Sequence, residues 1–353
     1  MVAFIRRVAY LAAGAVLTLL VAEGIARILP VQSALPLRDV SADNPIRRLQ
    51  PNSTNLYSRD WDLRGIQRST ANNEGYINPN DYLSKQSRNA PLVAVIGDSF
   101  VASLMLQYEE TFFGRLQHDL GQHRAVYSFG MDGSNAAEYL ASASFVRERF
   151  APDTLIVVIT AQNFRNSVWG HAAAIPDLNF FKIGESGVSL YRAPRKSNAL
   201  RRVFNQSALA RYIYFNLKLD IGTMFAAPRS LQAPVAKAQT STMPADLERN
   251  AVHYFLDKLP AASGLSRDHI VLIFDGDRAR LYGAPSLGDP MFDSIKREAA
   301  EDGYRIVDLE KAFAADWQAH RHPFDWYPEE YHWNGYAHAI VERELLRLLR
   351  EGA

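Results

Sequence analysis

The residues best suited to chemistry in this chain are a serine, a histidine and two glutamates. Ser99 stands in a Gly-Asp-Ser triplet directly after the apolar run 92–96, and His332 closely follows Glu329 and Glu330. A serine hydroxyl becomes a useful nucleophile when a base takes its proton, and an imidazole serves as that base when a carboxylate orients its other nitrogen. These residue types predict acyl transfer, with Ser99 as nucleophile and His332 as base.

The carboxylate partner of His332 is open between two neighbouring residues. Glu329 precedes the histidine by three positions and Glu330 precedes it by two. We favour Glu329 as the acid and keep Glu330 as the alternative; a Ser-His dyad without an acid is a third arrangement.

Acyl transfer also needs hydrogen-bond donors aimed at the oxyanion that develops on the acyl group. Three candidates follow the first three predicted strands: the backbone N–H groups of Ser99 and Gly133, and the side-chain amide of Asn163. The residues that come next are candidates for lining a substrate cleft: Arg165, Asn166 and Trp169.

The sequence offers no support for thiol catalysis or nucleic-acid binding and little support for a metal site. The chain has no cysteine, which excludes thiol catalysis and disulfides, and its net charge of +1 does not suggest a nucleic-acid surface. His320 and His322 lack a nearby set of carboxylates, so they are weak metal candidates. We expect no cofactor.

The elements that must position these residues alternate along the chain. Short apolar runs predict buried parallel strands at 92–96, 125–129, 154–160, 269–274 and 304–309. Amphipathic helices are predicted at 109–121, 136–150, 246–259 and 292–303. This alternation is typical of an α/β fold, with a five-stranded parallel sheet in a three-layer α/β/α sandwich.

Two parts of the chain stand outside that alternation. A large insertion is expected between the third and fourth strands, at about 170–265, with a mobile loop at 226–245 and a role as a lid. Residues 31–90 are polar and are expected to form an extracytoplasmic spacer that packs on the main domain, 91–353.

Residues 1–30 predict a transmembrane signal anchor. Arg6 and Arg7 precede an apolar run that begins at Val8, and about 22 residues are enough to cross a hydrocarbon core. The flanking arginines predict a cytoplasmic N-terminal tip with the rest exported. Glu23 and Arg27 are four apart and can pair on one helix face. A cleaved signal peptide is the alternative.

Four segments in order resemble the blocks of the SGNH (GDSL-type) hydrolase superfamily. They are "GDSF" at 97–100, "FGMDGS", "TAQNF" and "EEYHWN". The resemblance implies a flavodoxin-like sandwich, a Ser99 nucleophile, a His332 base and an oxyanion hole of Ser99, Gly133 and Asn163. The family's usual Gly and Asp of the third block are Ala161 and Phe164 here, and its usual acid Asp is a Glu.

The N-terminal layout, including the segment "NNEGYINP", is similar to membrane-anchored bacterial members linked to exopolysaccharide or cell-envelope acyl modification. The resemblance implies a periplasmic carbohydrate O-acyl esterase or O-acyltransferase on the inner membrane, with O-acetyl as the expected acyl group. Its partners would be acylated polysaccharide and envelope modification or export proteins. The alternative is a non-catalytic module of the same fold that binds polysaccharide or acts as a scaffold.

Overall fold

The computed structural model describes residues 1–185, 187–195, 204–219, 243–283, 290–327 and 330–351. The chain divides into two compact units, each described here by itself. One contains residues 1–36 and 54–69 together with the segment around 204–219, and the other contains 37–53, 70–195 and 238–353. The predicted spacer 31–90 is therefore shared between the two units.

The larger unit is organised around a five-stranded parallel sheet. Its strands are β3 (Leu92–Gly97), β4 (Ala125–Gly130), β5 (Thr154–Ile159), β8 (Ile270–Phe274) and β9 (Arg305–Asp308). Their order across the sheet is β4-β3-β5-β8-β9, and every neighbouring pair is parallel. This is the flavodoxin-like order. The predicted α/β class and the five predicted strands are confirmed.

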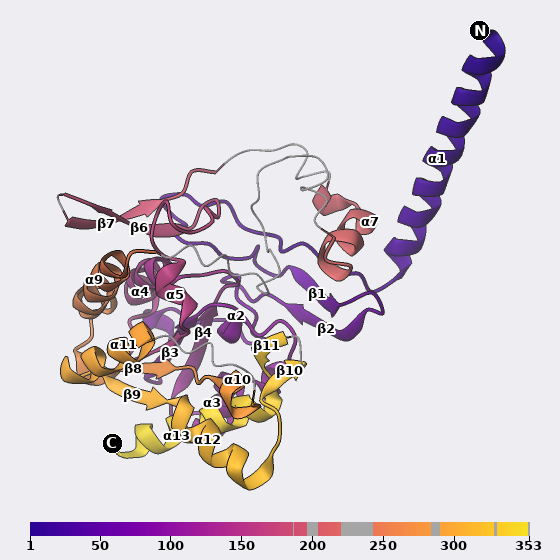
Figure 1. The fold of residues 1–353 in the computed structure, drawn as a ribbon. Coiled ribbons are helices and arrows are strands. Elements are labelled where there is room, and N and C mark those ends of the chain that lie inside the picture. The colour runs from indigo at the N-terminus through magenta and orange to yellow at the C-terminus, as the bar shows by residue number, and fades with distance from the viewer. Residues whose placement is uncertain (186, 196–203, 220–242, 284–289, 328–329, 352–353) are drawn as a thin grey trace. The chain divides into compact units, whose positions relative to one another are not determined.

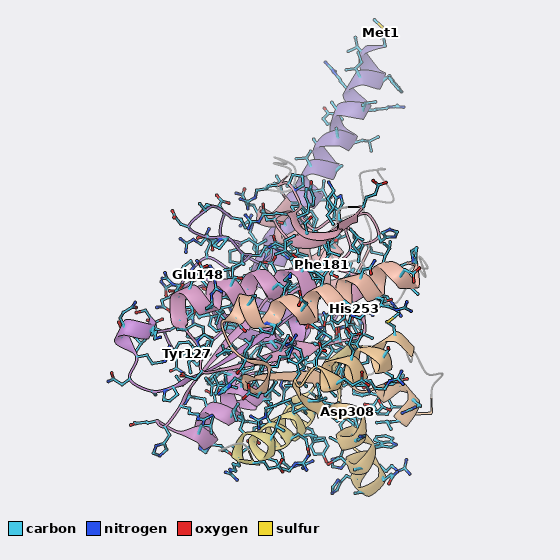
Figure 2. The ribbon with its side chains drawn as sticks, turned by 90° about the vertical axis from the view of Figure 1, so that its left-hand side faces the viewer. Met1, Tyr127, Glu148, Phe181, His253 and Asp308 are labelled. Carbon is cyan, nitrogen blue, oxygen red and sulfur yellow. The ribbon has the colours of Figure 1, made fainter. Side chains whose placement is uncertain are left out.

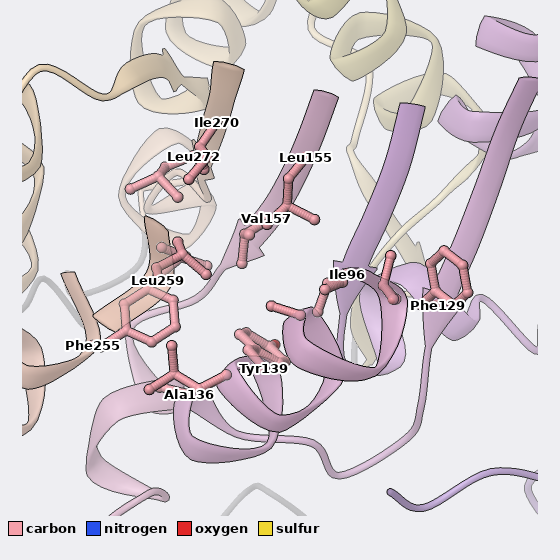
Figure 3. Packing of buried hydrophobic residues seen from close by; sticks show 14 of the residues in the cluster. Ile96, Phe129, Ala136, Tyr139, Leu155, Val157, Phe255, Leu259, Ile270 and Leu272 are labelled. Carbon is pink, nitrogen blue, oxygen red and sulfur yellow. The ribbon is translucent and has the colours of Figure 1, made fainter. Parts of the chain in front are cut away.

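Helices cover both faces of this sheet (Figure 1). The first face carries α4 (Ala136–Phe150), α9 (Ala245–Ser263) and α11 (Pro290–Glu301); the second carries α3 (Phe112–Leu120), α12 (Leu309–His320) and α13 (Gly335–Glu351). Alternate residues of a strand belong to opposite faces, because successive side chains of a strand point in opposite directions. In β3, Ile96 packs into the first core and Val95 into the second. Figure 3 shows the first core, where Tyr139 and Phe255 face the strands.

Three two-stranded ribbons and several short helices complete the elements. The ribbons are β1 (Thr54–Arg59) with β2 (Arg64–Thr70), β6 (Asn179–Gly184) with β7 (Gly187–Arg192), and β10 (Asp325–Tyr327) with β11 (Glu330–Trp333). The short helices are α2 (Ser99–Ala102), α5 (Gln162–Arg165), α7 (Ala208–Arg211), which continues as a π-helix at Tyr212–Asn216, and α10 (Arg278–Leu281). Single 3-10 turns occur at Lys85–Ser87, Tyr108–Glu110 and Arg267–His269. The sequence analysis predicted none of the ribbons.

The predicted insertion at about 170–265 contains one helix of the sheet layers. Helix α9 packs against α4, and Figure 2 shows the two side by side, with Glu148 and His253 labelled on them. Its Phe255, Leu256 and Leu259 are buried in the first core. The β6–β7 hairpin also contacts α4 and α9. Most of the predicted mobile loop at 226–245 lies outside the described residues.

Segments 37–53 and 70–90 are built into the larger unit by buried polar contacts. Arg48 Nη1 lies 2.7 Å from Glu74 Oε2, and the second oxygen of Glu74 accepts from Arg149 at 2.6 Å. Tyr82 stacks on Tyr127 with ring centroids 4.1 Å apart. This part of the predicted spacer is thus packed on the sheet domain.

The smaller unit contains α1 (Val2–Ile28), which is long and apolar enough to cross a membrane, as a signal sequence near an N-terminus also is. Its side chains are exposed over most of the helix, and Ala26 is its one buried residue. Arg27 Nε donates to Glu23 at 2.8 Å, so the predicted pairing of these residues is confirmed.

Candidate functional site

The turn after β3 presents Ser99 at the start of a short helix. Asp98 is the N-cap of α2, and its carboxylate accepts from the backbone N–H of Phe100 at 3.0 Å. Ser99 is the first helical residue, where backbone N–H groups have no intrahelical acceptor. A Cβ at Gly97 would lie 2.3 Å from the Val101 side chain, so glycine allows the helix to fold back closely on the strand. The cap of α2 and the predicted nucleophile are therefore adjacent residues of one turn.

His332 reaches this turn from β11, more than two hundred residues later in the chain. Its Nε2 lies 2.6 Å from Ser99 Oγ, and its Nδ1 contacts Glu330 Oε1. Protonation at Nδ1 satisfies both contacts, with the Nδ1–H donating to the carboxylate and Nε2 accepting from the hydroxyl. The three side chains form one hydrogen-bonded series of nucleophile, base and acid.

The strand conformation of β11 explains why Glu330 contacts the histidine. Residues two apart on a strand point to the same face, so Glu330 and His332 share a face. Glu330 is buried there, and Tyr331 is exposed. Glu329, the acid favoured by the sequence, lies outside the described residues.

Aromatic rings fix the plane of the imidazole. The ring of Phe100 lies 5.0 Å from that of His332, and the exposed ring of Tyr331 lies 4.6 Å from it in a stacked orientation. Phe100 also packs edge-on against the buried Trp333. The residue after the nucleophile thus packs against the strand that carries the base.

Asn163 is held beside the nucleophile turn. Its Nδ2 donates to Asp98 Oδ2 at 2.9 Å, and its Oδ1 accepts from the backbone N–H of Thr160 at 2.6 Å. An amide nitrogen carries two hydrogens, and one of them is used in the bond to Asp98. Burial raises the pKa of Asp98, while the hydrogen bonds from Asn163 and Phe100 N–H oppose that rise. Asp98 therefore joins the serine turn to the asparagine.

Gly133 follows β4 in the loop before α4. Its φ of +75° lies in the left-handed region, which favours glycine. Strands β3 and β4 pair with Gly97 opposite Gly130, so this loop begins at the sheet edge from which the Ser99 turn also begins. Strand β5, on the other side of β3, leads to Asn163. The three predicted oxyanion donors thus follow three adjacent strands.

The three predicted cleft residues have structural partners. Arg165 Nε lies 3.5 Å from the buried Glu248 of α9, and the Asn166 carbonyl accepts from Asn135 at 2.9 Å. Trp169 packs against Phe180 and Tyr191, on the β6–β7 hairpin. Contact of these residues with a substrate stays a prediction.

Of the two residues that depart from the resembled pattern in the third block, Phe164 is packed in the core. Phe164 stands where the family has an aspartate, and it is buried with its ring edge-on to Phe255 of α9. Ala161 is the N-cap of α5 and makes no side-chain cap. This block is thus anchored by core packing.

Two further histidines, His338 and His320, make no hydrogen bond to this series among the described residues. His338 is buried, and its Nδ1 accepts from the Phe112 N–H of α3 at 3.0 Å. His320 pairs with Asp316 at 3.4 Å. Among the described residues, no group of three or more histidines and carboxylates could hold a metal ion.

Sequence reasoning missed a buried ion-pair cluster behind the histidine strand, formed by Arg278, Asp275 and Asp325. The signal available was an Asp-x-x-Arg pattern directly after the fourth strand, at 275–278, where side chains gather at the carboxyl ends of the sheet. Asp275 accepts from the indole N–H of Trp333 at 3.0 Å, next to His332.

Comparison with known proteins gives likenesses among solved structures alone. No protein-family model matches the chain, and neither does a curated protein. A member of the lipolytic G-D-S-L family from Veillonella parvula is 10% identical, with a TM-score of 0.35 over 73% of this chain and 97% of that one.

Two further structures are similar over the same part of the chain. LAE5, an alpha/beta hydrolase enzyme from the Lake Arreo metagenome, is 15% identical, with a TM-score of 0.39 over 75% of this chain and 97% of that one. A two-domain esterase active on acetylated mannans is 11% identical, with a TM-score of 0.34 over 74% of this chain and 50% of that one.

Proposed function

We propose that the chain is a serine-dependent carbohydrate O-acyl esterase or O-acyltransferase of the SGNH type, with O-acetyl as the expected acyl group. The observation that carries the proposal is the series of contacts from Ser99 Oγ to His332 Nε2 and from His332 Nδ1 to Glu330. A buried carboxylate, an imidazole and a half-buried serine in this order are the groups that nucleophilic acyl transfer requires.

In the first half-reaction, Ser99 Oγ attacks the carbonyl carbon of the acyl ester as His332 Nε2 takes the hydroxyl proton. The imidazolium is stabilised by Glu330 across its Nδ1–H. The negative charge on the former carbonyl oxygen is held by the N–H groups of Ser99 and Gly133 and by the side-chain amide of Asn163. The C–O bond to the sugar then breaks, and His332 returns its proton to the leaving sugar oxygen.

In the second half-reaction, a hydroxyl attacks the acyl-enzyme. His332 takes its proton, the same three donors hold the oxyanion, and the Ser99 Oγ–C bond breaks as His332 reprotonates the serine. Water as the attacking group gives an esterase, and a sugar hydroxyl gives a transferase. Both reactions use the same residues, so the groups that exclude water decide between them.

The proposal also includes a location and partners. Helix α1 would hold the protein in the inner membrane with the sheet domain in the periplasm, because Arg6 and Arg7 flank its N-terminal end. Acylated envelope polysaccharide would then be in reach as substrate, together with the proteins that modify or export it.

The proposal is tested with the full chain in detergent micelles. Wild type is expected to hydrolyse p-nitrophenyl acetate, Ser99→Ala to lose that activity, and Ser87→Ala, which changes an exposed serine, to keep it. Mass spectrometry should find an acetyl adduct on Ser99. Unchanged hydrolysis in Ser99→Ala would overturn the nucleophile assignment, and inactivity of the folded wild type on all acyl donors would favour a binding module.

The adduct also distinguishes the two reactions. Acyl-Ser99 is followed in time with and without a polysaccharide acceptor. Loss to water alone identifies an esterase, and appearance of the acyl group on the acceptor identifies a transferase.

A further inference from the structure

A segment of the insertion packs against the end of α1. This segment, residues 204–219, is called the clamp segment here. Glu23 of α1 accepts from Ser207 Oγ at 2.8 Å and from the backbone N–H groups of Ala208 and Leu209 at 3.0 and 2.9 Å. One carboxylate of α1 therefore caps the helical part of the clamp segment, which begins at Ala208.

Further contacts join the clamp segment to the same end of α1. Arg27 donates to the Gln206 carbonyl at 3.2 Å, and Arg211 donates to the Gln32 carbonyl at 3.1 Å. Ala26 is 4% exposed in a small apolar cluster with Val31, Leu63 and Ala208. The last turns of α1 are thus part of a packed structure, while the side chains of the preceding turns are exposed.

The position of these contacts along α1 indicates the depth of the clamp segment relative to a bilayer that α1 would cross. Leu20 and Val21 are 63% and 55% exposed, and Glu23 is the first charged residue after Arg7. In a helix that crosses a bilayer, charged residues directly after the apolar run mark the point where the helix leaves the hydrocarbon core. The clamp segment contacts α1 at that point.

The composition of the clamp segment suits this depth. It combines aromatic and aliphatic side chains with cations: Phe204, Leu209, Tyr212, Ile213, Tyr214, Phe215, Leu217, Leu219, Arg211 and Lys218. Amphipathic aromatic rings gather at the headgroup level of membranes. The two cations have protein partners: Arg211 donates to the Gln32 carbonyl, and Lys218 Nζ lies 3.1 Å from Asp60.

We propose that the clamp segment lies on the surface of the bilayer that holds α1, with its aromatic and aliphatic side chains at headgroup depth. The proposal rests on the membrane anchoring included in the proposed function, and it adds a lipid-contacting surface supplied by the insertion. Glu23 holds the clamp segment there by accepting three hydrogen bonds from it.

The absence of cysteine from the chain allows a direct test. The full chain carries one nitroxide label, at Leu219→Cys in the clamp segment or at Leu17→Cys in α1, sites that are 55% and 63% exposed. Each protein is placed in lipid vesicles that contain phosphatidylglycerol. Collision of the label with oxygen and with a water-soluble nickel chelate then reports its depth.

The Leu219 label is expected to collide more often with oxygen, relative to the nickel chelate, than a free nitroxide in water does. Its depth in the bilayer should be shallower than that of the Leu17 label. A Leu219 label at the water value beside a deep Leu17 label would overturn the proposal and leave the anchor intact. A Leu17 label at the water value would overturn both the clamp surface and the anchoring, while hydrolysis by Ser99, assayed separately, would still stand.

The role of Glu23 is tested in the same system. Glu23→Ala should shift the Leu219 label towards the water value with the Leu17 label unchanged. Thr18→Ala is the matched control, because Thr18 bonds only to the Gly14 carbonyl of α1 among the described residues and should leave both labels in place. A Leu219 label that keeps its depth in Glu23→Ala would overturn the clamp.

A second inference comes from a separate observation in the larger unit, the buried Arg278 of α10. Its side chain is 6% exposed and contacts Asp275, Asp325 at 2.8 Å and the carbonyl oxygen of Tyr331. Asp275 in turn accepts from Trp333 Nε1. The residues on both sides of His332 are therefore tied to one ion-pair cluster.

This cluster connects the histidine strand to the sheet edge that carries the serine. Asp275 directly follows β8, and Asp325 begins β10, the partner strand of β11. The guanidinium carbon of Arg278 also lies 5.8 Å from the centre of the Phe100 ring, next to Ser99. A buried ion pair is weak evidence for stability, and fixing a geometry is one reason to retain it.

We infer that Arg278 is a positioning residue that sets His332 Nε2 against Ser99 Oγ. It touches neither substrate nor reacting atoms, so its loss should lower kcat for p-nitrophenyl acetate and leave KM nearly unchanged. A displacement of about 1 Å can cost about a hundredfold in rate, and that is the loss expected for Arg278→Met.

Three variants separate positioning from folding. Arg278→Lys keeps the charge with fewer contacts and should recover part of kcat, while Arg280→Met, at a 60% exposed arginine of the same helix, should match wild type. If Arg278→Met does not fold, the Lys variant with a native melting temperature still reports kcat. Folded Lys and Met variants with wild-type kcat, or a change in KM alone, would overturn the inference.

Discussion

At the scale of single residues, the choice of acid depends on the pleat of β11. Glu330 and His332 are two apart, so an extended strand places both side chains on one face. The buried Glu330 carboxylate contacts Nδ1 and leaves Nε2 free to face Ser99. A carboxylate at this position holds the imidazole in the tautomer that can accept the serine proton.

Glu330→Gln is therefore expected to lower kcat/KM for p-nitrophenyl acetate by on the order of 10⁴-fold, as loss of the charged partner does in related triads. Glu329→Gln changes the neighbouring residue and serves as the comparison. A larger loss in Glu329→Gln than in Glu330→Gln would show that Glu329 is the acid.

The buried His338 makes the stability of the protein depend on pH. Burial lowers its pKa to about 3 from 6.5, so the folded protein keeps the ring neutral while the unfolded chain takes up a proton below pH 6.5. The unfolded state then binds more protons than the folded state. The stability contributed by the neutral ring is complete above pH 6.5 and is lost as the pH falls from 6.5 towards 3.

We expect the free energy of unfolding to fall by up to about 1.4 kcal/mol per pH unit in this range from His338 alone. His338→Asn keeps an acceptor for the Phe112 N–H and removes the titration, so its unfolding energy should fall less steeply. Urea denaturation at a series of pH values measures both slopes, and parallel slopes would contradict the prediction.

At the scale of elements, the end of β4 packs directly against the helix that carries Ser99. A Cβ at Gly130 would lie 2.3 Å from the Ala102 nitrogen and 2.4 Å from the Val101 carbonyl carbon. These are backbone atoms, which cannot rotate away as a side chain can. The glycine thus sets how closely α2 approaches the sheet.

Gly130→Ala should cost about 1–3 kcal/mol of stability and lower kcat as well, because α2 and Ser99 must shift to make room. Gly184→Ala is the control, since a Cβ there meets nothing within 4 Å. Thermal melts and p-nitrophenyl acetate assays of both proteins check the prediction, and native activity in Gly130→Ala would refute the displacement of Ser99.

At the scale of the larger unit, Glu74 ties the segment 70–90 to both the segment 37–53 and α4. Its carboxylate forms ion pairs with Arg48, whose side chain is 3% exposed, and with Arg149 of α4. Removing one partner of a buried ion pair leaves an uncompensated charge, and Arg48 would carry that charge.

Glu74→Gln is expected to lower the free energy of unfolding by about 3–5 kcal/mol. Arg149→Gln should cost less than about 1 kcal/mol, because Arg149 is 53% exposed and water screens its pair. Equal losses in urea denaturation would mean that the burial of Arg48 is not what makes Glu74 important.

Much of the fold could be read from the chain because its signals are local. The five strands are predicted from short apolar runs, and α4 is predicted with its observed bounds. Both predictions are possible because the spacing of apolar residues within a segment indicates which of its faces is buried. Ser99 and His332 are predicted in the same way, as polar groups near the ends of predicted elements.

The tertiary structure decided what depends on residues distant in sequence. The sequence predicts no strand at His332, and pairing of β11 with β10 forms one that presents Glu330 beside the imidazole. Likewise Arg278 acquires its role from Asp325 and Tyr331, about fifty residues away along the chain. Periodicity reports which face of a segment is buried, whereas side-chain partners across the fold follow from packing that no single segment encodes.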